Sequence, residues 1–166
     1  MTRVRSKLIF AAWLSCLTLA MAVVLLAPRA ASADVWSSLK GRIFVSDAEF
    51  GSGYPTDAAM IAAIKKQSKD VIKAEGGSWT FHLMVFLKEP AGADKINIVY
   101  YDVTKKREQV NFSEVDVKPD QKMAQLNGIT VSKDLGFVQG HKYEILATRL
   151  VGGKEKVYAK TTLTLK

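Results

Sequence analysis

The second half of the chain alternates apolar and polar residues with a period of two, which is the pattern of β-strands that bury one face. In the run 79–88 the odd positions are apolar, and we expect them to face a core. The run 96–103 is apolar on both faces, which favours a central strand that is covered on both sides. Further strands are expected at 41–46, 108–112, 115–117, 123–126, 129–131, 142–147 and 157–166.

Two dipeptides between these runs have the chemistry of tight hairpin turns. Gly152-Gly153 separates the last two strands and predicts a two-residue hairpin between them. Asn127-Gly128 predicts a second hairpin between 123–126 and 129–131.

One segment, 56–74, has a helical period instead. Thr56 is expected to cap the helix, and Gly76-Gly77 is expected to end it. Apolar residues recur at spacings of three, four, seven and eight and define one face: Met60, Ile61, Ile64, Val71 and Ile72.

About seven short strands with one helix inserted after the first predict a mainly β fold, an antiparallel sandwich of two sheets. The segment 136–145 contains Gly140-His141-Lys142-Tyr143 near the start of the penultimate strand. It resembles the tyrosine corner of immunoglobulin-like and fibronectin-like domains, which implies that the Tyr143 hydroxyl bonds back to the preceding loop. The cysteine pair of the immunoglobulin family is missing, and the resemblance implies no ligand.

Residues 1–33 have the pattern of a cleavable secretory signal. A basic start is followed by the uncharged apolar run 8–27 and then by Ala31-Ser32-Ala33. We expect cleavage after Ala33 and a single exported domain, 34–166, in the periplasm or outside the cell. The run 8–27 is also long enough to cross a bilayer, so an uncleaved N-terminal anchor is the alternative.

The expected signal contains the only cysteine, Cys16, so the mature domain has no thiol for a disulfide or a metal. The bulky Trp13 before Cys16 argues against a lipoprotein signal. The net charge of +8 falls to +4 when the four basic residues of 1–33 are removed. Since no dense arginine stripe with interleaved aromatic residues remains, nucleic acid is not an expected partner.

Candidate chemistry in the mature chain is sparse. His82 and His141 are isolated, are too few for a zinc site, and are interpreted as surface or rim histidines. Ser78, His82 and Asp102 form a triad only on paper, because no serine has the Gly-x-Ser-x-Gly surroundings of a nucleophile. We therefore expect no cofactor, no metal and no catalytic residues, and an enzyme is the least favoured class.

The leading hypothesis is an exported, non-enzymatic module of the cell envelope or secreted fraction that acts by binding or as a structural part. Its partner is unknown, with an envelope protein or an anionic polysaccharide or lipid surface as candidates. The alternative is a basic adhesion module for anionic envelope polymers or lipid headgroups. Its contact residues would be the helix lysines Lys65, Lys66, Lys69 and Lys73 and the turn residues Lys105, Lys106 and Arg107. A solvated helix face and a polar hairpin tip are the simpler interpretation.

Overall fold

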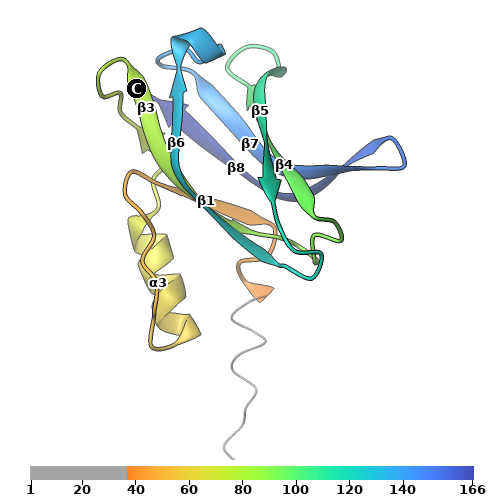
Figure 1. The fold of residues 1–166 in the computed structure, drawn as a ribbon. Coiled ribbons are helices and arrows are strands. Elements are labelled where there is room, and N and C mark those ends of the chain that lie inside the picture. Colours follow the sequence, from red (N-terminus) through yellow and green to blue (C-terminus); the bar gives the residue numbers. More distant parts are fainter. Residues whose placement is uncertain (1–36) are drawn as a thin grey trace, which may run out of the picture. The chain divides into compact units, whose positions relative to one another are not determined.

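The computed structural model describes residues 37–166, which belong to one compact unit, Asp34–Lys166. The expected export signal, its cleavage site and Cys16 lie outside the described residues. The described chain is mainly β, with eight strands and one α-helix (Figure 1). Its elements are β1 (Arg42–Ser46), α3 (Asp57–Gln67), β2 (Val71–Ile72), β3 (Ser78–Phe86), β4 (Lys95–Asp102), β5 (Glu108–Asp116), β6 (Met123–Ser132), the 3-10 turn η1 (Lys133–Leu135), β7 (Lys142–Val151) and β8 (Lys154–Leu165).

All eight strands belong to a single sheet, with the order β5-β4-β7-β8-β1-β3-β6 and with β2 also paired to β8. The sheet curls into a half-barrel (Figure 1). β1 and β2 run parallel to β8, whereas the other neighbours are antiparallel. The mainly β class and the helix after the first strand are confirmed, but the sheet is mixed and continuous rather than two antiparallel layers. β8 makes the sheet continuous and mixed, because its twelve residues pair with β7 on one side and with β1 and β2 on the other.

The core lies inside the curl and receives the odd residues of β3, as the alternation predicts. A second, smaller apolar cluster lies on the opposite face of β1 and β3, where α3 covers it. Ile64 of the helix is fully buried there with Phe44 and Phe86. β3 is therefore buried on both faces, and the helix replaces a second sheet as its cover.

The helix ends earlier than its apolar spacing predicts. Thr56 caps it as expected and accepts a hydrogen bond from the Ala59 N–H at 3.1 Å, but Ser68 is already extended. Val71 and Ile72 leave the helix and pair with the end of β8. Both are β-branched, and pairing with a strand stabilises such residues more than a further helical turn does.

The glycine pairs behave differently from one another. Gly152-Gly153 forms the predicted hairpin between β7 and β8, with φ of 56° and 76°. Gly76-Gly77 does not end a helix but turns the chain between β2 and β3, with φ of 61° and 86°.

The prediction of a hairpin at Asn127-Gly128 is wrong. Both residues lie inside the continuous strand β6, opposite His82, where the pairing with β3 shifts register. The imidazole Nδ1 of His82 accepts the Gly128 N–H at 3.2 Å, so the histidine holds the irregularity in place. His82 is only 8% exposed, and its interpretation as a surface histidine is also wrong.

β4 is confirmed as an internal strand, since it pairs with β5 on one side and β7 on the other. Ile96, Ile98 and Tyr100 face the core. No second layer of sheet covers the opposite face of β4 in the described chain, contrary to the expectation of a doubly covered strand.

β5 is one continuous strand, 108–116, rather than two short runs.

Candidate functional site

A shallow groove of about 210 Å³ lies on the outer face of the sheet, across β5, β4, β7 and the start of β8. Side chains alternate along a strand, so Asn97 and Val99 of β4 face away from the core-facing Ile96 and Ile98. Seven residues line the groove: Asn97, Val99, Gln109, Phe112, Thr148, Leu150 and Glu155.

Strand register brings these residues together from distant parts of the sequence. Val99 pairs with Phe112 on β5, and Asn97 pairs with Thr148 on β7. Val99 is only 5% exposed, whereas Phe112 is 57% exposed and Leu150 is 68% exposed. The groove thus combines a buried apolar side chain with two prominent ones that water surrounds.

The polar side chains of the groove are largely unpaired. Asn97, Gln109 and Thr148 make no side-chain hydrogen bond to any other residue of 37–166. Glu155 is the only ionisable residue in the lining, and it accepts a long hydrogen bond of 3.5 Å from the Tyr101 hydroxyl. The carboxamides of Asn97 and Gln109 are therefore free to meet a ligand beside the apolar side chains, whereas Thr148 is buried.

Arg107, one of the predicted basic contacts, is held beside this groove. Its guanidinium lies 3.5 Å from the centre of the Tyr101 ring, and its Nε donates to Glu144 at 3.0 Å. The hydrogen bond to Glu144 raises the pKa of Arg107. Two intramolecular partners already engage this cation, so its charge is partly compensated within the chain.

The other predicted basic residues do not form one surface. Figure 1 shows α3 at the lower end of the molecule and the β4–β5 turn at the upper end. Lys69 and Lys73 are not on the helix, which ends at Gln67, and the Lys69 ammonium lies 4.0 Å from Asp47. The remaining predicted lysines are exposed and have no ion pair to another residue of 37–166: Lys65, Lys66, Lys73, Lys105 and Lys106.

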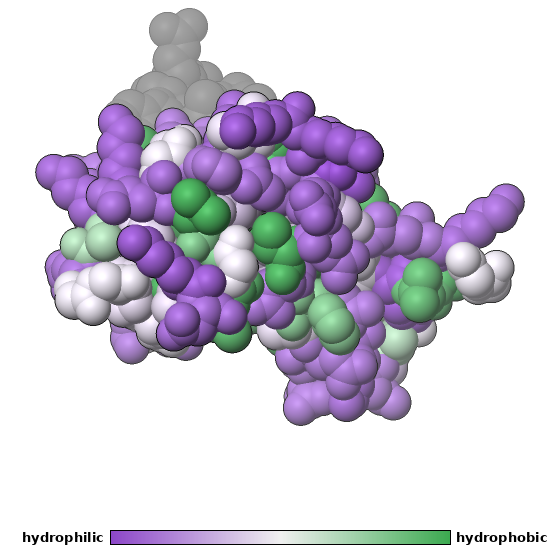
Figure 2. Space-filling view, turned by 90° about the horizontal axis from the view of Figure 1, so that it is seen from above, coloured by the Kyte–Doolittle hydropathy of each residue, from purple (hydrophilic) through white to green (hydrophobic). Residues whose placement is uncertain are grey.

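The upper end of the molecule also carries the loop between β6 and β7. Figure 2 views this end from above and shows a mainly hydrophilic surface with apolar residues in small areas. Leu135 and Val138 of this loop are exposed apolar residues. Since neither lines the outer-face groove, they offer matched controls for it.

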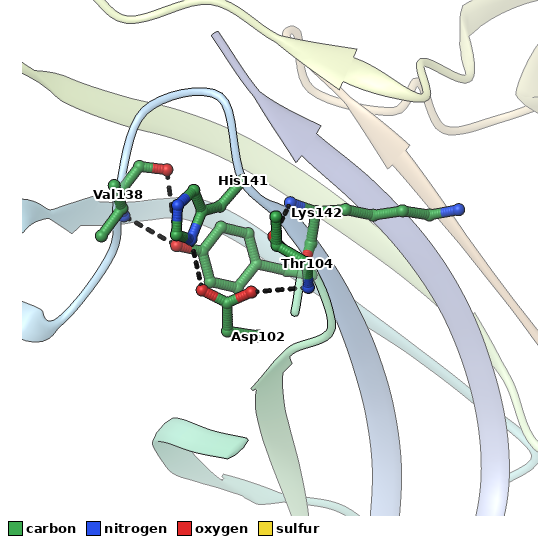
Figure 3. A network of polar contacts seen from close by, with 6 residues as sticks. Asp102, Thr104, Val138, His141 and Lys142 are labelled. Carbon is green, nitrogen blue, oxygen red and sulfur yellow. Dashed lines mark hydrogen bonds and ion pairs between the residues drawn. The ribbon is translucent and has the colours of Figure 1, made fainter. Parts of the chain in front are cut away.

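An Asp–His pair joins two loops at the same end (Figure 3). The His141 Nδ1 lies 2.5 Å from the Asp102 carboxylate, whose other oxygen accepts the Thr104 N–H at 2.8 Å. Partial burial acts to raise the pKa of Asp102, but hydrogen bonds from His141 and Thr104 outweigh it and lower the pKa. The pair ties the end of β4 to the residue that precedes β7.

Ser78, His82 and Asp102 do not form a triad, because each side chain bonds to a different partner. His82 bonds to Gly128, Asp102 bonds to His141, and the Ser78 hydroxyl donates to the Glu75 carbonyl. Within residues 37–166, no three His, Cys, Asp or Glu side chains gather as metal ligands would. No helix in the same part of the chain has the length and apolar character needed to cross a membrane.

No family model, no curated protein and no solved structure matches this chain. The function must therefore be inferred from the geometry of its own residues. Sequence reasoning missed the groove and named none of its lining residues as candidates. The one available signal was the run 96–103, whose second apolar face contains Val99.

Proposed function

We propose that this chain is an exported, non-enzymatic module of the cell envelope or secreted fraction that binds a partner through its outer-face groove. The exposure of Phe112 and Leu150 together, from strands far apart in the sequence, carries this proposal. Apolar side chains that gather beside unpaired polar groups are typical of interaction sites. The secretory pattern of residues 1–33 supports the compartment.

Phe112 and Leu150 leave apolar surface in contact with water, and covering that surface would contribute binding free energy. Burying a large apolar side chain contributes about 1.5–3 kcal/mol. Phe112 and Leu150 obtain little of this within the fold, because each keeps more than half of its surface exposed. A partner that covers both would gain the remainder, while the fold itself depends little on either residue.

A retention experiment tests the proposal. The purified protein, its Phe112→Asp and Leu150→Asp variants and the control Leu135→Asp are immobilised and exposed to solubilised native envelope. We expect the unchanged protein and the control to retain the same component and both groove variants to lose it. Equal retention by all four proteins would refute a role for the groove. Turnover in a broad hydrolase screen, lost on changing one polar residue, would instead establish an enzyme.

A second candidate function is adhesion to anionic envelope polymers or lipid headgroups. The exposed lysines without ion pairs support it, with Lys65 and Lys66 on the last turn of α3. Binding to anionic vesicles or alginate would then fall with rising salt and would be lost in a Lys65→Glu, Lys66→Glu, Lys69→Glu variant. Unchanged binding in that variant would remove this candidate.

Kinship with immunoglobulin-like domains remains a proposal about fold. Its support is local: the Tyr143 hydroxyl accepts the Val138 N–H at 2.7 Å, which is the bond of a tyrosine corner. Such kinship would assign no ligand to the chain.

A further inference from the structure

The groove has the dimensions of a site for one compact chemical unit. Its volume of about 210 Å³ is below the roughly 300–1,000 Å³ of sites for drug-sized molecules. A standard protein interface engages about 20–30 residues on each side, which is many more than the residues that line this groove. Its size alone therefore favours a small ligand or one unit of a polymer over a folded protein.

The free polar groups match a ligand rich in hydroxyls. The carboxamides of Asn97 and Gln109 each present donors and an acceptor, whereas Thr148 is buried and only 2% exposed. A hydroxyl group of a sugar is also both a donor and an acceptor, so each can complete the other. Glu155 is the only charged residue in the lining, and its carboxylate disfavours an anionic ligand at this position.

Phe112 supplies the apolar surface that such a ligand needs. The C–H groups on one face of a pyranose ring are apolar and pack against an aromatic ring. Phe112 is exposed and lines the groove beside the carboxamides. Tyr101 is less suited, because the guanidinium of Arg107 already covers one face of its ring.

We propose that the groove binds a neutral pyranose unit of a polysaccharide, stacked on Phe112 and hydrogen-bonded to Asn97 and Gln109. This assignment rests on the proposed binding function of the same face, and it names the chemistry of the ligand. The site recognises a sugar by shape and hydroxyl pattern rather than by charge. Because screening weakens only interactions between charges, binding is insensitive to salt.

Calorimetry with neutral oligosaccharides tests the assignment. The probes are oligosaccharides of β-1,4-glucan, β-1,3-glucan, xylan, mannan, galactan and chitin, with alginate as the anionic comparison. We expect the protein to bind at least one neutral probe, equally at low and high salt. Phe112→Ala and Asn97→Ala should each weaken binding about tenfold or more, which equals about 1.4 kcal/mol. Phe112→Tyr, which keeps the ring, and the control Leu135→Ala should bind as the unchanged protein does.

Three results would overturn the assignment: no binding to any neutral probe, binding to alginate alone, or affinity that is unchanged in Phe112→Ala. Circular dichroism confirms that each variant is folded, and Phe112→Tyr separates loss of stacking from loss of structure. If the envelope experiment identifies a protein partner that Phe112→Asp loses, the sugar assignment fails while the binding function stands. If neither experiment detects a ligand at this face, both proposals fail.

Discussion

The hydroxyl of Tyr100 is buried in the core without a hydrogen-bond partner among residues 37–166, so its removal is expected to stabilise the fold. Tyr100 is 3% exposed, and burial raises the pKa of its phenol, although the Ser113 hydroxyl opposes the rise without forming a hydrogen bond of normal geometry. An unsatisfied buried polar group costs about 1–3 kcal/mol. Tyr100→Phe keeps the ring and its edge contact with Phe137 at 5.6 Å between centroids. We expect the free energy of unfolding to rise by about 1 kcal/mol.

The same chemical change at two other buried tyrosines should have the opposite sign. The Tyr143 hydroxyl accepts the Val138 N–H at 2.7 Å, and the Tyr158 hydroxyl donates to the Ala91 carbonyl at 3.1 Å. Tyr143→Phe removes one oxygen and leaves the Val138 N–H without that partner, so it should lower the free energy of unfolding by about 1–2 kcal/mol. Tyr158→Phe removes one of two donors to the Ala91 carbonyl, which also accepts from Arg149 Nη1 at 3.0 Å, so its loss should be about 1 kcal/mol.

Urea denaturation followed by circular dichroism measures all three variants against the unchanged protein. The slope of the free energy with urea should stay constant, so that midpoint shifts report stability alone. For a chain of this size, 1 kcal/mol corresponds to about 2–4 °C in the thermal midpoint. A loss of stability in Tyr100→Phe as large as that in Tyr143→Phe would refute the reasoning. An equal loss in Ser113→Ala would then identify the Ser113 hydroxyl as the partner that Tyr100 has.

Three further predictions concern the loops and the helix. The lowered pKa of Asp102 stabilises the folded state above the ordinary carboxyl pKa of about 3.9. Asp102→Asn should therefore cost about 1 kcal/mol near pH 7. In denaturation curves the difference from the unchanged protein should begin to shrink below about pH 4 and disappear once Asp102 is protonated in the folded state as well. Ile64→Ala should cost about 2–5 kcal/mol in urea denaturation, because Ile64 is fully buried under α3 and a cavity remains. Gly152→Val should lower the thermal midpoint because a β-branched residue is strained at φ of 56°, whereas Gly152→Asn should be tolerated; equal midpoints would contradict this.

The sequence predicts an element well when the element's own residues determine what it packs against or pairs with. The alternation of β3 fixes which residues face the core, and Gly152-Gly153 fixes a hairpin between adjacent strands. The end of the helix depends on a partner far along the chain, since Val71 and Ile72 pair with the last residues of β8. Helical spacing cannot reveal a strand more than 90 residues away.

Local turn chemistry misleads in a similar way at Asn127-Gly128. Gly128 adopts a positive φ of 65°, as a turn would need, but the conformation serves an irregularity within β6. What decides between the two outcomes is His82, which lies 46 positions away in sequence and accepts the Gly128 N–H. A dipeptide therefore predicts the backbone conformation better than it predicts the topology.

The sequence did not reveal the groove for a different reason: only part of the length of β7 and β8 packs on the core. Ala147 and Ala159 are the last pair of the two strands that is fully buried toward the core, and Gly152-Gly153 turns the chain beyond them (Figure 1). Leu150 lies on the outer face of β7, beyond the part of the strand whose inner face packs on the core. A sequence pattern does not mark where that part ends, so a core residue and a binding residue look alike. The exposure of Leu150 has a consequence: Leu150→Asp should alter binding with little effect on stability, because Leu150 is 68% exposed and lines the groove.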